Sequence, residues 1–452
     1  MVEAAASFRL ACRAPDDAVF RLKDRIVIAA MFLAMANRLA DELPAGEHMV
    51  NLCHDRLQFT VALAAALLRG QVSLLTSDRT PDRLCTLADR FSGLYSLSDD
   101  PALISPLRHH LFRPQSAWAD AGERANPEIP ASRLAAVVFT SGSTGEPVAH
   151  HKHWGTLAER SIDAAARFGM TESCPASIVG MVPPHHMYGF ETTVLLPLHA
   201  PASAWCGAAF YPEDVAAALR AVPAPRVLVT TPLQIRALLH ASIELPPLAR
   251  IISATAPLFP DVAAAAERRW DTRVFEIFGA TEVGSIASRR TVEGDVWTTY
   301  PRVRVSHSAI AVDPAETLVS GPFAEPLELS DVIETLDPNH FRLLGRRADM
   351  IKLGGRRASL ADLNRILTGI EGVLDGQFVA PEHLDRHPTA RLLAFVVAPE
   401  RSADDILTVL RGHIDPPFLP RRVIRVDELP RNDVGKLTDQ ALGALRARLG
   451  NA

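Results

Sequence analysis

The stretch L-A-A-V-V-F-T-S-G-S-T-G-E-P, from Leu134 to Pro147, decides the fold. Its apolar first half, Leu134 to Phe139, predicts a buried strand that runs directly into a turn rich in glycine and hydroxyl residues. Small residues let a backbone approach a polyanion closely, so this turn is suited to holding nucleotide phosphates. The spacing G-x-x-x-x-G-K-[ST] is absent, which disfavours a P-loop protein.

Helical and strand-like segments alternate on both sides of this stretch. Before it, the pattern predicts a helix over Asp24–Leu39, a strand over His48–Cys53, a helix over Leu57–Leu68 and a strand over Val72–Thr76. After it, strands are predicted at Ser177–Val182, Arg226–Thr230, Arg250–Ala254 and Val274–Phe278, with helices at Leu233–His240 and Val262–Trp270. This rhythm is typical of an α/β fold built from layered, mostly parallel sheets with helices.

The predicted order of helices and strands changes after Gly345. The pattern there predicts a helix over Leu360–Ile370 with Ser359 and Asp362 in capping-box spacing, a strand over Leu392–Ala398, a helix over Asp404–His413 and a strand over Val423–Val426. We therefore expect two domains, a large one over residues 1–345 and a small α+β one over residues 346–452.

Composition narrows the class of protein. The chain has 452 residues, 48% of them hydrophobic, and a net charge of -5 without a basic face or an acidic tail. These values disfavour a nucleic-acid binder and favour small-molecule partners. The five cysteines are widely spaced, which fits a reducing compartment, and no stretch approaches the roughly 18 apolar residues of a membrane span. We expect a cytoplasmic protein.

Four further motifs follow the glycine-rich turn. They are F-G-A-T-E at Phe278–Glu282, L-S-D at Leu329–Asp331, G-R-R-A-D-M-I-K-L-G-G-R-R at Gly345–Arg357 and L-P-R-N-D-V-G-K at Leu429–Lys436. In this order they resemble the superfamily of adenylate-forming enzymes, which includes acyl-CoA synthetases, aryl acid ligases and nonribosomal adenylation domains. The resemblance covers residues 134 to 440 and implies an AMP-forming acid–thiol ligase with a mobile C-terminal domain.

The resemblance implies ATP and Mg²⁺ as cofactors. Glu282 would hold the metal ion, Asp331 would bind the ribose hydroxyls, and Lys436 would stabilise the charge that develops between the carboxylate and the α-phosphate. With His186, Glu282 and Lys436 form the predicted catalytic set. The residues assigned to ATP are Thr140, Ser141, Gly142, Ser143, Thr144, Gly145, Thr255, Phe278, Gly279, Thr281, Asp331 and Arg346.

The resemblance also assigns an acid pocket. His186 begins an H-x-x-G element that lines and gates the pocket in the family, although a lone histidine also serves in packing. Tyr188 and Thr192 fall where relatives that activate aromatic acids contact the ring, and a core role for both stays open. S-A-T-A-P-L at Ser253–Leu258 resembles a stretch that flanks adenine and the acyl group. The substrate-binding residues predicted in this way are His186, Tyr188, Gly189, Thr192, Ala254 and Ala280.

The chain departs from the family pattern at several positions. Val148 replaces the lysine that usually follows the phosphate loop, which leaves Lys152 as the nearest cation. The hinge position is Ala348, next to Asp349, and Asp439 replaces an arginine after the last motif. We interpret His150–His153 as a solvated or phosphate-facing loop, because no carboxylate or cysteine accompanies the histidines to form a metal site.

The predicted reaction is ATP-dependent activation of a carboxylic acid, followed by transfer to a thiol. Gly354 and Gly355 would let a pantetheine arm pass, whether it belongs to CoA or to an acyl carrier protein. A narrower resemblance to AMP-ligases of aryl polyene and xanthomonadin pigment biosynthesis favours a hydroxylated aromatic acid such as 4-hydroxybenzoate. The alternatives are a medium-chain fatty acyl-CoA synthetase and a nucleotide-binding pseudoenzyme. A nicotinamide dehydrogenase is disfavoured, because G-x-G-x-x-G is missing after the strands.

Overall fold

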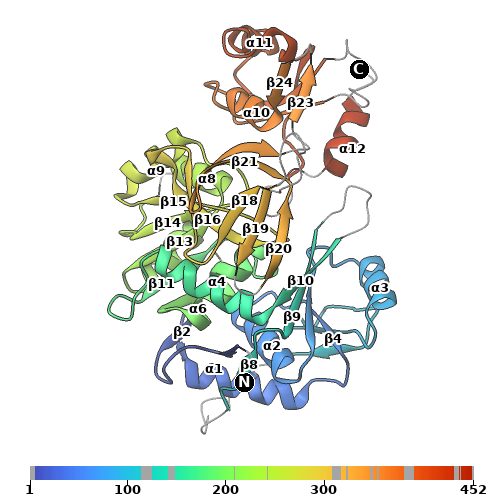
Figure 1. The fold of residues 1–452 in the computed structure, drawn as a ribbon, viewed down its shortest axis with the longest axis vertical. Helices are drawn as coiled ribbons and strands as arrows, with labels where there is room; N and C mark the ends of the chain where they lie inside the picture. Colours follow the sequence, from blue (N-terminus) through green and yellow to red (C-terminus); the bar gives the residue numbers. More distant parts are fainter. Residues whose placement is uncertain are drawn as a thin grey trace. The chain divides into compact units, whose positions relative to one another are not determined.

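The computed structural model describes residues 6–113, 125–140, 148–207, 209–241, 243–307, 317–321, 324–346, 350–353, 356–380, 391–431, 437 and 439–449. The chain divides into two compact units (Figure 1). The first comprises Met1–Gly294, Thr298–Arg304 and Ser320–Leu327, and the second comprises Asp295–Trp297, Val305–Val319 and Glu328–Ala452. The domain boundary near residue 346 stays a prediction.

The two strands that flank the glycine-rich stretch in sequence belong to a six-stranded sheet in the first unit. Its order is β10 (Val148–His153), β9 (Leu134–Thr140), β5 (Val72–Leu75), β4 (His48–Asn51), β6 (Tyr95–Ser98) and β7 (His109–Leu111). All pairs are parallel except β9 with β10. Beside this sheet, β1 (Ser7–Arg9) pairs with β8 (Glu128–Pro130).

A second, longer sheet carries the other predicted motifs of this unit. The strands of this sheet that lie wholly or partly in the first unit are, in spatial order, β17 (Val296–Thr299), β16 (Gly284–Arg290), β15 (Val274–Ala280), β14 (Arg250–Ser253), β13 (Arg226–Thr230), β11 (Ala176–Gly180), β12 (Ala202–Trp205), β2 (Ala18–Arg21) and β3 (Ile26–Ile28). The run from β15 to β2 is parallel, and both ends are antiparallel. The predicted class of layered, mostly parallel sheets with helices is confirmed.

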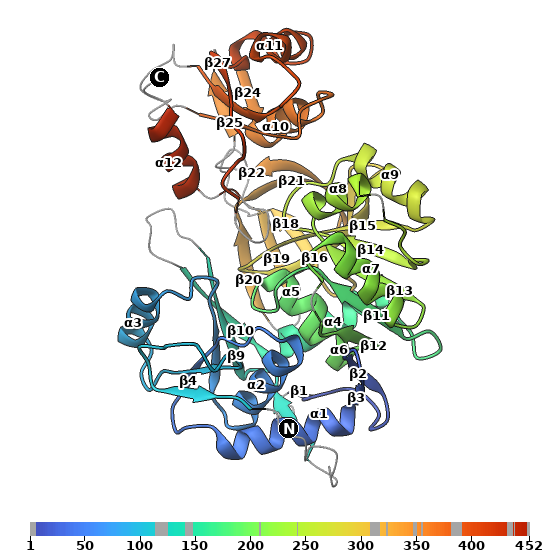
Figure 2. The same cartoon turned by 180° about the vertical axis from the view of Figure 1, so that it is seen from behind.

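Helices cover both faces of this sheet (Figure 2). One core packs α7 (Pro212–Ala221), α8 (Pro232–His240) and α9 (Pro260–Trp270) against strands β11 and β13 to β15. A larger core joins the two sheets through α1 (Ala29–Glu42), α2 (Arg56–Leu68), α4 (Trp154–Arg167), α6 (Leu196–His199) and the π-helix η2 (Phe190–Leu195). On the outer face of the six-stranded sheet lies α3 (Pro81–Arg90). The described residues of this unit also form two short helices, α5 (Met187–Gly189) and the 3-10 helix η3 (Thr291–Glu293).

The second unit contains a hairpin and a small α+β core. The hairpin is formed by β21 (Asp331–Asp337) and β22 (His340–Arg346). The core contains β23 (Met350–Leu353), β24 (Arg356–Ser359), α10 (Leu360–Thr368), β25 (Asp375–Val379), β26 (Leu393–Val397), α11 (Ala403–Arg411), the 3-10 helix η6 (Pro416–Phe418), β27 (Arg422–Arg425) and α12 (Asp439–Leu449). Three further strands, β18 (Arg304–His307), β19 (Thr317–Gly321) and β20 (Ala324–Leu329), form a sheet in that order.

Two local predictions were wrong. The helix expected from Asp24 begins at Ala29, because Ile26–Ile28 pair with β2 as a hairpin strand. Ser359 is the N-terminal cap residue of α10, but its side chain makes no capping hydrogen bond. Within the described residues, no helix is both long and apolar enough to cross a bilayer.

Candidate functional site

A tight turn between β15 and β16 carries the Thr281–Glu282 pair. Ala280 pairs with Gly284 in register, so Thr281–Val283 connect the two strands. Gly284 has φ +75, a conformation that glycine adopts at little steric cost. A Cβ atom at this position would lie 2.6 Å from Oε1 of Glu191. The glycine therefore closes the turn and also leaves room for a carboxylate behind it.

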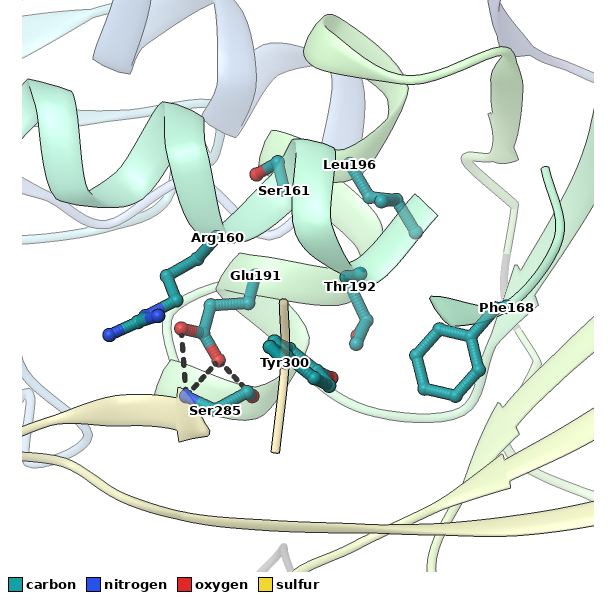
Figure 3. A pocket seen from close by; sticks show the side chains of 9 residues that line it. Arg160, Ser161, Phe168, Glu191, Thr192, Leu196, Ser285 and Tyr300 are labelled. Carbon is teal, nitrogen blue, oxygen red and sulfur yellow. Dashed lines mark hydrogen bonds between the residues drawn. The ribbon is translucent and has the colours of Figure 1, made fainter. Parts of the chain in front are cut away.

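Glu191 holds one end of this turn from the π-helix η2. Its carboxylate accepts hydrogen bonds from the Ser285 backbone N, 3.1 Å from each oxygen, and from the Ser285 hydroxyl (Figure 3). Burial raises the pKa of Glu191, and the hydrogen bonds from Ser285 and the charges of Lys152 and Arg160 oppose that rise. The carboxylate is thus tied to the start of β16.

Lys152 reaches the same turn from β10. Its Nζ donates a 2.8 Å hydrogen bond to the backbone carbonyl of Glu282, and the residue is only 5% exposed. Burial lowers the pKa of Lys152 to about 8, against the attraction of Glu191 and Glu282. Because β10 directly follows the glycine-rich turn in sequence, this bond links that stretch to the Thr281–Glu282 turn.

The histidine cluster His150–His153 is part of β10, so the prediction of a loop there was wrong. Antiparallel pairing with β9 explains it, since Val148 lies opposite Thr140 and residues 149–153 continue the strand. Val148 is 50% exposed, whereas Lys152 points into the protein. Lys152 donates to the Glu282 carbonyl there.

The H-x-x-G element lies at the start of a helical segment. His186 is half-buried and precedes α5, while Gly189 packs so closely that a Cβ atom would lie 2.1 Å from the Pro183 carbonyl oxygen. The π-helix η2 follows immediately, and such helical irregularities are frequent at functional sites.

Tyr188 and Thr192 are buried within this segment. The Tyr188 hydroxyl lies 2.8 Å from the Ile252 carbonyl oxygen and 3.1 Å from that of Thr230, and the Thr192 hydroxyl donates to the Tyr188 carbonyl at 2.6 Å. Thr192 also lines a cavity of about 10 Å³, which is room for one water molecule rather than an acid (Figure 3). Both side chains thus have core contacts, and their contact with substrate stays a prediction.

The S-A-T-A-P-L segment follows the end of β14. Ala254 is buried, and Thr255 has φ +82, a conformation that β-branched residues rarely adopt. Glu276 of β15 accepts a 2.8 Å hydrogen bond from the Leu258 backbone N and forms a 2.7 Å ion pair with Arg289. A buried glutamate therefore holds this segment too.

The turn carries one carboxylate, that of Glu282, and within the described residues no group of three or more His, Cys, Asp or Glu side chains is placed to hold a metal ion. Glu282 is half-buried, and its charge interacts with those of Lys152 and His150. Carboxylate oxygens are the ligands that Mg²⁺ prefers, so Glu282 is suited to hold it. Phe278 and Gly279 precede the turn on β15, and Ala280 and Thr281 are half-buried beside Glu282.

The remaining predicted residues lie elsewhere or outside the described residues. Thr140 ends β9 in the first unit. Asp331 and Arg346 belong to the second unit, where they are register partners in the β21–β22 hairpin. Outside the described residues lie Ser141, Gly142, Ser143, Thr144, Gly145, Ala348, Asp349, Gly354, Gly355 and Lys436.

Sequence reasoning missed three residues that hold the candidate segments, namely Glu191, Ser285 and Glu276. Glu191 carried a weak signal, because it is a lone acid within the otherwise uncharged run M-Y-G-F-E-T-T-V-L-L. Glu276 likewise stands alone in the apolar strand V-F-E-I-F. Acids rarely become buried in such runs without hydrogen-bond partners, so both positions could have been marked as structural or functional.

Comparison with known proteins shows the family of the chain. The AMP-binding enzyme family matches residues 26–317. A 4-coumarate–CoA ligase of Rhodobacter capsulatus is 30% identical over 321 residues, which cover 68% of this chain and 76% of the relative. The chain therefore belongs to the AMP-binding enzyme family, within the adenylate-forming superfamily. It is an AMP-forming acid–thiol ligase, which activates a carboxylic acid with ATP.

Solved structures share the fold. ATP-bound MatB from Rhodopseudomonas palustris superposes with a TM-score of 0.81 at 21% identity and covers 96% of both chains. The o-succinylbenzoate CoA synthetase MenE of Bacillus subtilis, solved with its acyl-adenylate intermediate, has a TM-score of 0.77 at 18% identity and covers 95% of this chain and 96% of MenE. MenE has also been solved with ATP and a magnesium ion.

Proposed function

We propose that this ligase activates a hydroxylated aromatic acid, such as 4-hydroxybenzoate, and passes it to the thiol of an acyl carrier protein or of CoA. The hydrogen bonds made by the segment 186–195, which contains His186, α5 and η2, carry the proposal. Glu191 in this segment binds Ser285 at the Thr281–Glu282 turn, and Tyr188 binds the backbone of β14 just before Ala254. Acid activation needs the carboxylate beside the α-phosphate, and contacts between the segment that begins at His186 and the Thr281–Glu282 turn support that requirement.

The aromatic substrate is supported by the relative in Rhodobacter capsulatus, whose name gives 4-coumarate as its acid. Coumarate carries a phenol hydroxyl, as hydroxybenzoate does. The carrier protein is supported by the narrower resemblance to AMP-ligases of pigment biosynthesis, in which a hydroxybenzoate-type acid is loaded onto a carrier.

We assign the following roles to residues of this chain. Lys436 stabilises the negative charge that develops on the carboxylate and the α-phosphate as pyrophosphate leaves. The stretch Thr140–Gly145 covers the terminal phosphates, Asp331 and Arg346 bind the ribose side of the nucleotide, and Glu282 holds Mg²⁺. When bound, Mg²⁺ neutralises phosphate charge. His186 and Gly189 line the acid pocket.

Exchange of labelled pyrophosphate into ATP tests the first half-reaction. The native chain is assayed with hydroxybenzoates, cinnamates and medium-chain fatty acids, beside Lys436→Ala and Lys23→Ala, which removes an exposed lysine of the first unit. We expect exchange with hydroxylated aromatic acids only, a loss of about a hundredfold to a thousandfold in Lys436→Ala, and no change in Lys23→Ala. Exchange confined to fatty acids would reject the aromatic substrate, and no exchange with any acid would favour a nucleotide-binding pseudoenzyme.

The acceptor is tested separately, with the acid found by exchange. Product formation is compared with CoA and with a phosphopantetheinylated acyl carrier protein at equal thiol concentration. A preference of about tenfold or more for the carrier protein, equivalent to about 1.4 kcal/mol, would support loading of a carrier. The same preference for CoA would reject it.

A further inference from the structure

Two buried side chains hold the Thr281–Glu282 turn from elements that are distant in sequence. Lys152 binds the Glu282 carbonyl from 130 residues away, and Glu191 binds Ser285 from 94 residues away. The first contact fixes the peptide of the residue predicted to hold Mg²⁺. The second fixes the strand that leaves the turn.

The turn is short enough for these two contacts to set its conformation. Only Thr281–Val283 lie between the paired residues Ala280 and Gly284, and the backbone N of Val283 donates back to the Ala280 carbonyl at 3.2 Å. On such a short turn, the orientation of the peptide planes sets the direction of the side chains. Holding the Glu282 carbonyl therefore restrains the direction of the Glu282 carboxylate.

The charges of Lys152 and Glu191 interact with that of Arg160, which belongs to a charged cluster. Arg160 lies beside Glu191 (Figure 3), and its charge also interacts with Asp163 and Glu159. Arg302 closes the cluster with ion pairs of 3.0 Å to Glu159 and 2.7 Å to Asp163. The cluster contains three basic residues, Lys152, Arg160 and Arg302, and three acidic ones, Glu159, Asp163 and Glu191. The Arg302 side chain is 39% exposed, whereas the other five residues are buried, and the opposite charges around them lower the cost of their burial.

We propose that Lys152 and Glu191 are positioning residues of the adenylation reaction, which hold the Thr281–Glu282 turn in the geometry that binds magnesium and the α-phosphate. The inference rests on the proposed function of this turn. Partners that orient a metal ligand from behind typically contribute 10- to 100-fold in metal affinity or activity. Lys152 therefore acts through the Glu282 backbone rather than by contact with the phosphates.

The test uses Ser285→Ala, which removes the hydroxyl bound to Glu191 and keeps the backbone N–H. The matched control is Ser161→Ala, because the Ser161 hydroxyl is also buried beside the same cavity but donates within its own helix, to Leu157 at 3.0 Å. Magnesium is titrated at fixed ATP, with nucleotide binding followed by calorimetry and turnover by pyrophosphate exchange. Thermal midpoints of all variants are recorded at the same time.

We expect Ser285→Ala to weaken the apparent magnesium affinity and the exchange rate by about tenfold or more, with an unchanged KM for the acid, whereas Ser161→Ala changes neither by more than about twofold. Lys152→Met, a second variant, should show the same loss of magnesium affinity and exchange rate with the same unchanged KM for the acid. The contrary result is that Ser285→Ala and Lys152→Met bind magnesium and ATP as Ser161→Ala does and change only the thermal midpoint. In that case Lys152 and Glu191 only stabilise the fold, and the proposal fails. If the native chain exchanges with no acid, the proposed function fails, while the magnesium dependence of nucleotide binding still decides the positioning role.

Discussion

The Thr281–Glu282 turn and the Ser253–Leu258 segment leave the ends of neighbouring strands, and each is held by one buried glutamate. Glu191 accepts from the Ser285 backbone N and Glu276 accepts from the Leu258 backbone N. The two segments differ at their residue of positive φ, which is Gly284 in the first and Thr255 in the second. The first segment therefore relaxes its backbone with a glycine, whereas the second keeps a strained residue. The comparison shows that the buried glutamate that holds a segment and the backbone strain within that segment are independent features.

Removal of the Glu276 carboxylate should have the largest effect, because this residue supports a segment by hydrogen bond and ion pair at once. Glu276→Ala is expected to lower the free energy of unfolding by about 3–5 kcal/mol, the usual cost of deleting one partner of a buried pair. Chemical denaturation measures this value. The control is Glu293→Ala, which breaks the ion pair of the 65% exposed Glu293 with Arg290 and should cost less than about 1 kcal/mol. Equal costs for the two variants would show that Glu276 does not anchor the segment.

Gly284→Ala tests the Thr281–Glu282 turn, in which the residue of positive φ is a glycine. A residue with a Cβ at φ +75 costs about 1–2 kcal/mol, and the new atom would also displace the Glu191 carboxylate, 2.6 Å away. Gly70→Ala is matched in backbone, because Gly70 has φ +70 and a Cβ there would meet only Arg133 at 3.6 Å. Denaturation should show a larger loss for Gly284→Ala, and pyrophosphate exchange should fall in that variant alone. Similar losses in both variants would mean that Glu191 moves away without consequence.

The sequence predicted the strands of this site better than the contacts that hold it. Arg226–Thr230 was predicted with the bounds that β13 has, because a run of apolar residues signals a buried parallel strand locally. The start of α1 was misplaced, because the pairing of Ile26–Ile28 with β2 depends on a neighbouring strand. Glu191 and Lys152 could not be linked to the turn, since no local pattern encodes contacts across 94 and 130 residues. The phosphate-loop departure at Val148 was visible, but the inward direction of Lys152 was not.

Of the three substitutions, Thr255→Gly should change the free energy of unfolding least, and it should raise this free energy rather than lower it. Relief of positive φ at a β-branched residue is worth about 1–2 kcal/mol, and the added flexibility of glycine in the unfolded chain removes about 0.5–1 kcal/mol of that gain. We expect the free energy of unfolding to rise by about 0.5–1 kcal/mol while pyrophosphate exchange slows, because strain held at a functional segment fixes its geometry. Asp271→Gly serves as control, since Asp271 has φ +43 at the end of α9 and aspartate tolerates this region. A Thr255→Gly variant that is less stable than the native chain would show that contacts of the threonine side chain outweigh its backbone strain, and the difference between the two segments would then lie in their side chains.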